Sequence, residues 1–157
     1  QGRVEWIGLR PERHAPVEAV SEVLAREGTG LEGDRFNTKG GGRQVTLIQA
    51  EHIAVVASLL GRAELAPSLL RRNLVVAGIN LFALRNQRFT VGEALFEGTG
   101  HCHPCSLMEE ALGSGGFAAM RGHGGITARV LRTAPIRLGD TVVRVEGLSP
   151  SIDEVER

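Results

Sequence analysis

The sequence predicts a mainly β (α+β) protein, in which a curved, barrel-like mixed sheet is flanked by two or three helices. Short segments with alternating apolar residues recur along the chain, and seven or so of them are typical of strands. Glycine is abundant, with 21 of 157 residues, which favours tight turns and close backbone approaches over a helical bundle. Strand and helix segments do not alternate regularly enough for a doubly wound parallel sheet.

The first half of the chain is expected to contain the longest helix, placed between short strands. In order, the expected elements are strands at 3–9 and, more weakly, 17–24, an ordered irregular loop at 28–42, a strand at 45–48, a helix at 53–60, a short helix at 67–70 and a strand at 73–77. The longer helix is predicted because Ile53, Val56, Ala57 and Leu60 fall on one helical face. Gly61 ends it.

The second half is more clearly β. Residues 89–97 alternate imperfectly and are predicted to form one strand that bends or bulges at Gly92. A short helix is expected at 105–112, ending at Gly113, and strands at 125–131 and 141–145.

Composition indicates one domain over residues 1–157, without internal repeats or a long linker. The 18 basic and 18 acidic residues cancel, so no overall charge attracts nucleic acid or a membrane surface, and neither is expected as a partner. Apolar runs are too short to span a bilayer, and no signal peptide opens the chain. With two cysteines only three residues apart, we expect no disulfide framework and a cytoplasmic location.

Two glycine-rich motifs are candidates for anion binding. Residues 28–33 match G-x-G-x-x-G, but no helix follows, so a glycine-rich turn is favoured over a dinucleotide site. Residues 39–44 could cradle an anion with backbone N–H groups, assisted by Arg43; the alternative is a surface loop. The segments 71–73 and 121–125 also carry arginines that suit either a pocket or a solvated surface.

The segment from His101 to Cys105 is the strongest candidate for chemistry. A structural zinc site would need four ligands. Cys102 and Cys105 supply two, and His101, His103 and His123 are the candidates for the others. A dithiol redox pair would fit a βαβ setting, which this pattern lacks. The third alternative is one activated thiolate at a helix start, able to carry sulfur or ligate a soft metal. Two small residues in a buried turn remain the alternative without function.

Seven sequence blocks together resemble the MOSC domain, named for the C-terminal domain of molybdenum cofactor sulfurases. They are GLEGDR at 30–35, RQVTLI at 43–48, RNLVVAG at 72–78, FTVG at 89–92, CHPC at 102–105, GGITARV at 124–130 and LGDTV at 138–142. The resemblance runs from about Val4 to Val145, in the family's order, and the chain resembles the small stand-alone bacterial members.

The resemblance implies a barrel-like fold and a molybdenum cofactor (molybdopterin). The family's hallmark cysteine falls on Cys105, which in sulfurases is proposed to carry sulfur as a persulfide and in related amidoxime-reducing enzymes ligates molybdenum. The family's Arg-Asn pair, which helps hold the pterin, matches Arg72 and Asn73. We expect Cys105 as the catalytic and metal-binding residue. The expected cofactor-binding residues are Arg72, Asn73, Arg129, Arg43 and His103.

Several functional classes stay open at this point. The chain shows no aminotransferase-like segment, so no pyridoxal phosphate site is expected, although full sulfurases combine such a domain with a MOSC domain. A molybdenum-dependent oxidoreductase and a sulfurtransferase are both possible, with a reductase or a cysteine desulfurase as the partner. The alternative classes are a non-catalytic zinc- or sulfur-binding module using Cys102, Cys105 and a histidine, and a simple interaction domain.

Overall fold

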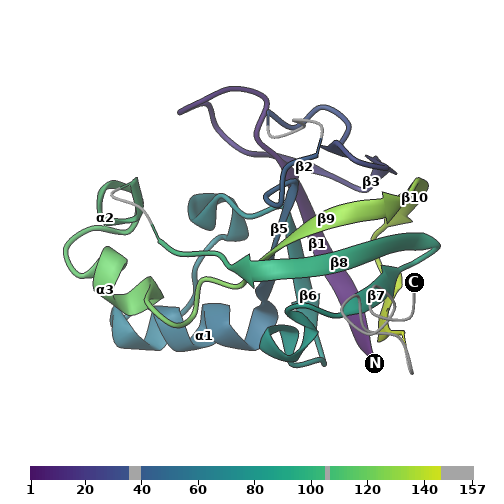
Figure 1. Cartoon of the computed structure of the whole chain (residues 1–157). Helices are drawn as coiled ribbons and strands as arrows, with labels where there is room; N and C mark the ends of the chain where they lie inside the picture. Colours follow the sequence, from purple (N-terminus) through teal and green to yellow (C-terminus); the bar gives the residue numbers. More distant parts are fainter. Residues whose placement is uncertain (36–39, 105–106, 146–157) are drawn as a thin grey trace.

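The computed structural model describes residues 1–35, 40–104 and 107–145, and in this part of the chain seven strands close into a barrel (Figure 1). Around the barrel the strands are β11 (Thr141–Arg144), β7 (Arg88–Val91), β8 (Ala94–His101), β9 (Ile126–Arg132), β5 (Val45–Gln49), β6 (Leu74–Ala77) and β1 (Gly2–Leu9). Pairing of β1 with β11 at Gly2 and Val142 completes the closure. The pairs are antiparallel except β5–β6, so the predicted mixed, barrel-like sheet is confirmed.

Four short strands extend this barrel. β2 (Glu18–Val20) adds to the outer part of β1, whereas β3 (Glu22–Arg26) pairs with β10 (Ala134–Arg137) and β4 (Gly30–Leu31) in a separate small sheet. The predicted strand at 17–24 was therefore wrong as a single element, because the chain breaks at Ser21 and its two halves join different sheets. This division depends on pairing partners distant in sequence, which the weak local alternation does not reveal.

The helices gather at one side and below the barrel (Figure 1). They are α1 (Ala50–Leu59), α2 (Leu107–Leu112) and α3 (Gly116–Met120), with the 3₁₀ turns η1 (Pro67–Leu70) and η2 (Leu81–Leu84). The helix at 53–60 and the turn at 67–70 are confirmed, whereas η2, α3, β4 and β10 were not predicted. For the expected helix at 105–112, the described part is α2, and residues 105–106 lie outside the described residues. None of the described helices is long and apolar enough to cross a membrane.

β5 lies between two hydrophobic cores. Its Val45 and Leu47 pack inside the barrel, and Ile48 packs on the opposite side with Val56 of α1 and Met108 of α2. Both of its faces are therefore covered, which explains why its apolar residues form a run rather than an alternation. Ile48 of β5 and Val75 of β6 together attach the helical layer to the barrel.

The predicted bent strand at 89–97 is in fact the hairpin β7–β8. Val91 pairs with Ala94 across a two-residue turn at Gly92 and Glu93. Gly92 has a φ of +58°, in the left-handed region that such a tight turn requires. The break in the alternating pattern at Gly92 is therefore the point where the chain reverses direction, not a bulge within one strand. This reversal sends β8 back across the barrel to His101, where the candidate site begins.

Candidate functional site

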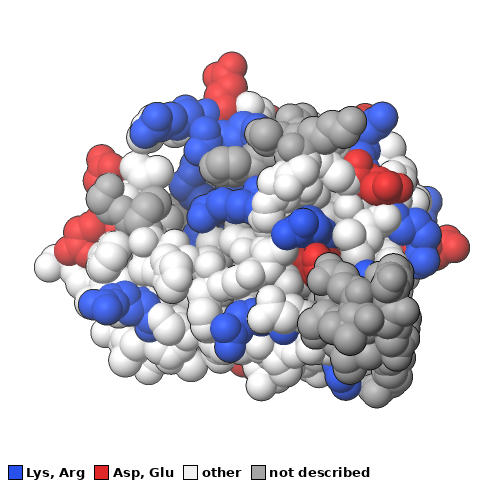
Figure 2. Space-filling view, in the orientation of Figure 1, with Lys and Arg blue, Asp and Glu red and all other residues white. Residues whose placement is uncertain are grey.

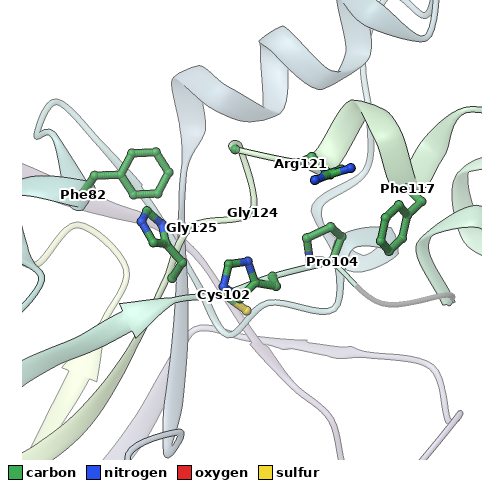
Figure 3. Close-up of a pocket in the computed structure, with 10 residues that line it drawn as sticks. Phe82, Cys102, Pro104, Phe117, Arg121, Gly124 and Gly125 are labelled. Atoms are coloured by element: carbon green, nitrogen blue, oxygen red, sulfur yellow. The ribbon is translucent and has the colours of Figure 1, made fainter.

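A pocket of about 570 Å³ opens where β8 ends (Figure 3). It is lined by Phe82, His101, Cys102, His103, Pro104, Phe117, Arg121, Gly122, Gly124 and Gly125. These residues come from η2, the end of β8 with the three residues that follow, α3 and the segment between α3 and β9. Its volume is in the range typical of pockets for small organic ligands.

Aromatic rings form much of the pocket wall. The ring centroids of Phe82 and His101 are 5.1 Å apart, and those of His101 and His103 are 5.8 Å apart. Phe117 and Pro104 lie at the other end of the pocket, where the Arg121 side chain also lies (Figure 3). The pocket therefore combines flat apolar surfaces with a cationic group.

The carboxylate of Glu109 connects α2 to the start of α3 and so positions this end of the pocket. It accepts hydrogen bonds from the Phe117 N–H at 2.9 Å and the Gly115 N–H at 3.1 Å. These two bonds lower the pKa of Glu109, because they stabilise its ionised form. Phe117 and Arg121 thus depend on a cap from the preceding helix for their placement.

Gly124 and Gly125 form one wall of the pocket, at positions where the surrounding backbone leaves no space for a side chain. A Cβ at Gly125, which has a φ of +87°, would lie 1.8 Å from the Leu47 carbonyl oxygen. A Cβ at Gly124 would lie 2.3 Å from the Cys102 carbonyl oxygen. The Cys102 N–H also donates to the Gly125 carbonyl at 2.9 Å, so this backbone is pressed against both β5 and the end of β8.

Arg72 lies against this wall but is not a lining residue. It is 4% exposed, and its Nε donates to the Gly124 carbonyl oxygen at 2.8 Å. Nη1 donates to the Leu70 carbonyl at 2.9 Å and Nη2 to the Cys102 carbonyl at 3.5 Å. The structure therefore brings Arg72 next to the pocket, with its guanidinium engaged by main-chain oxygens.

Asn73 belongs to a buried polar network in the barrel wall. Its Oδ1 accepts from the Thr46 N–H and from Arg10 Nη2, each at 3.0 Å, and its Nδ2 donates to the Gly8 carbonyl and to Asp34 Oδ1, also at 3.0 Å. Arg10 and Asp34 form a buried salt bridge at 3.0 Å. Asn73 is fully buried and does not line the pocket.

Arg129 and Arg43 are placed away from the pocket lining. Arg129 lies on β9, with its Nε 3.4 Å from Glu97 Oε1 on β8. Arg43 is exposed and follows Gly42, whose carbonyl accepts from Thr99 Oγ1 at 2.6 Å. A Cβ at Gly42 would lie 3.7 Å from Arg129 Nη2, so the glycine-rich loop and Arg129 do come together, on the β8–β9 surface.

The described part of the cysteine segment enters the pocket. Cys102 is buried at 2% exposure and His103 is exposed, and both line the cavity. Cys105, expected to be the reactive and metal-binding residue, lies outside the described residues. Within residues 1–35, 40–104 and 107–145, no three histidine, cysteine or acidic side chains form a group that could hold a metal ion.

A second pair of histidines, His52 and His123, lies next to the pocket. The His52 ring on α1 has its centroid 5.4 Å from Phe82 and 5.4 Å from His123. Burial lowers the pKa of His52, and the nearby His123 lowers it further, whereas Glu51 opposes the shift. Residues 52 and 123 are far apart in sequence, so no local spacing indicates this pair.

The surface around the site is locally basic although the chain is neutral. Figure 2 shows Lys and Arg side chains gathered above the end of β8, between the upper loops and the helices, with Asp and Glu side chains mostly toward the margins. A neutral protein can therefore still present a field that attracts an anionic ligand at this face.

Comparison with known proteins gives a family match and several structural relatives. The family model of the MOSC domain matches residues 31–143. The YuaD protein from Bacillus subtilis has a TM-score of 0.78 at 19% identity, covering 90% of this chain and 93% of that one. YiiM from Geobacillus stearothermophilus has a TM-score of 0.74 at 18% identity, covering 99% and 84%. YiiM from Escherichia coli has a TM-score of 0.70 at 22% identity, covering 94% and 71%. No curated protein gives a significant sequence match.

Proposed function

The chain belongs to the MOSC domain family, and we propose that it binds a molybdenum cofactor in the pocket at the end of β8, where the Cys105 thiolate acts on the metal. The observation that carries this proposal is the path of the chain. His101, Cys102, His103 and Pro104 all line the pocket, and Cys105 is the next residue in the sequence. The family's hallmark position therefore directly follows the pocket wall.

The described residues fit such a cofactor. A pterin is flat and heteroaromatic, and the rings of Phe82, His101 and Phe117 offer surfaces against which it can pack. Arg121 offers a fork of N–H donors that matches the oxygens of the cofactor's phosphate. The volume of about 570 Å³ accommodates a ligand of this size.

In this proposal the chain's residues bind and orient, while the cofactor supplies the reactive centre. Bound molybdenum would supply redox chemistry or accept sulfur. Cys105 would ligate the metal through its thiolate, since soft thiolate ligands suit such a metal. His103, which lines the pocket, would offer a hydrogen-bonding group to the bound cofactor. A carrier role, in which Cys105 holds a persulfide, is the competing outcome of the test below.

We further propose a cytoplasmic setting, where reducing conditions keep Cys105 from forming a disulfide. A partner is required in either role. A metal-ligating Cys105 implies a reductase that returns electrons to the metal, and a carrier Cys105 implies a cysteine desulfurase that supplies sulfur.

The proposal is tested by elemental analysis of freshly purified protein together with fluorescence detection of the oxidised pterin. We expect molybdenum and pterin to co-purify with the wild type, and molybdenum to be lost in Cys105→Ser. Cys102→Ser is the matched control, because it changes the other cysteine three residues away and is expected to retain the metal. Wild-type protein without molybdenum or pterin, from cells that make the cofactor, would contradict the proposal.

The same preparation separates the competing roles. After treatment with a cysteine desulfurase, a persistent mass gain of about 32 Da on Cys105, one sulfur atom, would indicate a carrier. Stoichiometric zinc that is lost in Cys102→Ser would instead indicate a zinc module.

A further inference from the structure

We propose that Arg72 is a positioning residue that acts on the pocket without touching the ligand. From behind the pocket wall, its guanidinium holds together the two backbone segments on which Cys102 and Gly124 lie. This inference deepens the proposed function, since it concerns the same pocket, but it makes a claim about the protein without ligand that is tested separately.

The hydrogen bonds of Arg72 give the basis for this role. Nε donates to the Gly124 carbonyl at 2.8 Å, and Nη2 lies 3.5 Å from the Cys102 carbonyl oxygen. Both acceptor residues line the pocket, whereas Arg72 does not. The arginine therefore bridges the end of β8 and the segment before β9 on the side away from the cavity. Hydrogen bonds from a charged donor are stronger than those between neutral groups, and burial strengthens them further.

The close approach at Gly124 makes the bridge sensitive to small displacements. A Cβ at this position would lie 2.3 Å from the Cys102 oxygen and 3.1 Å from Arg72 Nη2. Cys102, Gly124 and the guanidinium thus meet with no space for an added methyl group. A shift of the backbone at Cys102 or at Gly124 would break its hydrogen bond to Arg72, so the arginine holds the two segments at a fixed distance from each other.

The local backbone explains how Arg72 reaches this place. Arg71 ends η1 in the left-handed conformation, with φ of +55°, which turns the chain sharply before β6. Arg72 Nη1 also donates to the Leu70 carbonyl at 2.9 Å and is thereby fixed to the turn from which it projects. Its side chain is thus anchored at its own turn as well as at the pocket wall.

The consequence concerns the residues that follow Cys102. The chain runs from this anchored carbonyl through His103 and Pro104, both of which line the pocket, toward Cys105. Loss of the anchor is expected to free the segment that carries the pocket wall. Ligand affinity should then fall although no ligand contact has been removed.

The test uses Arg72→Met, which keeps an unbranched side chain but removes all donors, and Arg72→Lys, whose single ammonium cannot reproduce the planar fork. Val142→Ala is the control, because it shortens a fully buried side chain in β11 and lowers global stability away from the pocket. Three quantities are measured on the full chain: hydrogen exchange of the Cys102 amide, alkylation of the Cys102 thiol by iodoacetamide, and molybdenum content.

In Arg72→Met we expect the Cys102 amide and thiol to react about tenfold faster or more, through local opening, while exchange in the β7–β11 pair stays unchanged. In Arg72→Lys, the protection of Cys102 should lie between that of Arg72→Met and that of the wild type. If Arg72→Met does not fold, Arg72→Lys is compared with the wild type in its place. Val142→Ala should speed exchange in β7–β11 without selectivity for Cys102. Molybdenum content should fall at least severalfold in Arg72→Met.

Equal acceleration at Cys102 and in β7–β11, or an unchanged Cys102, would overturn the inference. So would molybdenum retained at the wild-type level by Arg72→Met despite a loosened Cys102. Failure of the proposed function gives a different result: the wild type then lacks molybdenum, while selective protection of Cys102 by Arg72 remains measurable and supports the positioning role.

Discussion

Asn73 donates from Nδ2 to Asp34 Oδ1 at 3.0 Å, and both residues are buried, with exposures of 0% and 3%. The contact joins residues 39 positions apart, one in the loop after β4 and one just before β6. Since Asp34 also forms a salt bridge with Arg10, Asn73 completes a network that ties the segment after β1 and the loop after β4 to the start of β6. The geometry assigns to Asn73 a role in stability.

The first prediction follows from this network. Asn73→Ala should lower the free energy of unfolding by about 3 kcal/mol or more, because it leaves buried charged and backbone groups without their partner. Urea denaturation measures the change. Asn80→Ala, at an exposed position, is the control and should change stability by less than about 0.5 kcal/mol. An Asn73→Ala protein of wild-type stability that has lost the cofactor would show instead that Asn73 acts on the ligand.

The second prediction concerns the glycine wall of the pocket. Gly125→Ala should be severely destabilising, by about 3 kcal/mol or more, because its methyl group would overlap the Leu47 carbonyl in addition to straining a left-handed backbone. Gly122→Ala is the matched control: its φ of +80° is similar, but a Cβ there meets nothing within 4 Å. We expect it to cost only about 1 kcal/mol. Thermal unfolding followed by circular dichroism compares the stability of the two variants. Equal losses of stability would contradict the expectation that the added methyl group overlaps the Leu47 carbonyl.

The third prediction is a pH dependence at His52. Its pKa in the folded protein lies below the ordinary value of about 6.5, so the unfolded chain binds the proton more readily. Its contribution to stability is therefore present above pH 6.5 and is lost as the pH falls through the folded pKa. His52→Gln should flatten this part of the stability profile measured by denaturation from pH 7.5 to 5.

An NMR titration of the His52 imidazole tests the physical cause. The wild-type pKa should lie below 6.5, and His123→Gln should raise it, because the second cause of the shift is removed. Burial remains in that variant, so the pKa should stay below the ordinary value. A His52 pKa at or above 6.5 in the wild type would contradict both the burial effect and the pairing.

The fourth prediction tests whether Arg121 contacts the ligand without contributing to the stability of the fold. Arg121→Met should weaken cofactor retention by about tenfold or more with little change in stability, because it removes a charged donor from the pocket lining. Arg132→Met is the control, since Arg132 binds the Glu93 carbonyl beside the β7–β8 turn, outside the pocket lining. Pterin fluorescence per protein measures retention. Equal retention by both variants would exclude Arg121 from the ligand site.

Much of the barrel was predictable because its strands carry their own pattern. β9 buries Ile126, Ala128 and Val130 at every second position, and this period of two is visible in the sequence. The helix at 53–60 is likewise marked by three apolar residues that the structure buries, Ile53, Val56 and Ala57. In contrast, α3 and η2 are single turns without an apolar period, and neighbouring elements stabilise them. Glu109 caps α3 from outside, which no local window detects.

The candidate site also has residues that the sequence indicates and contacts that only the tertiary structure reveals. The segment from His101 to Cys105 was singled out by its residue types. The structure places its first four residues, 101–104, in the pocket lining, and Cys105 lies outside the described residues. Arg72 and Asn73 were also conspicuous, but their partners come from carbonyls and side chains up to 65 residues away. Although Arg72 and Asn73 are adjacent in the sequence, Arg72 therefore binds the backbone of the pocket wall and Asn73 binds groups in the barrel wall.

The sequence by itself determined the family, the mainly β class and the segment that carries the cysteines, because motif order and side-chain period are local properties. Only the tertiary structure decided that Arg72 lies behind the pocket and Asn73 inside a closed network. The physical reason is that a buried polar group takes whichever partner the packing brings within hydrogen-bond distance. That partner is set by strand register and by close approaches such as the one at Gly124.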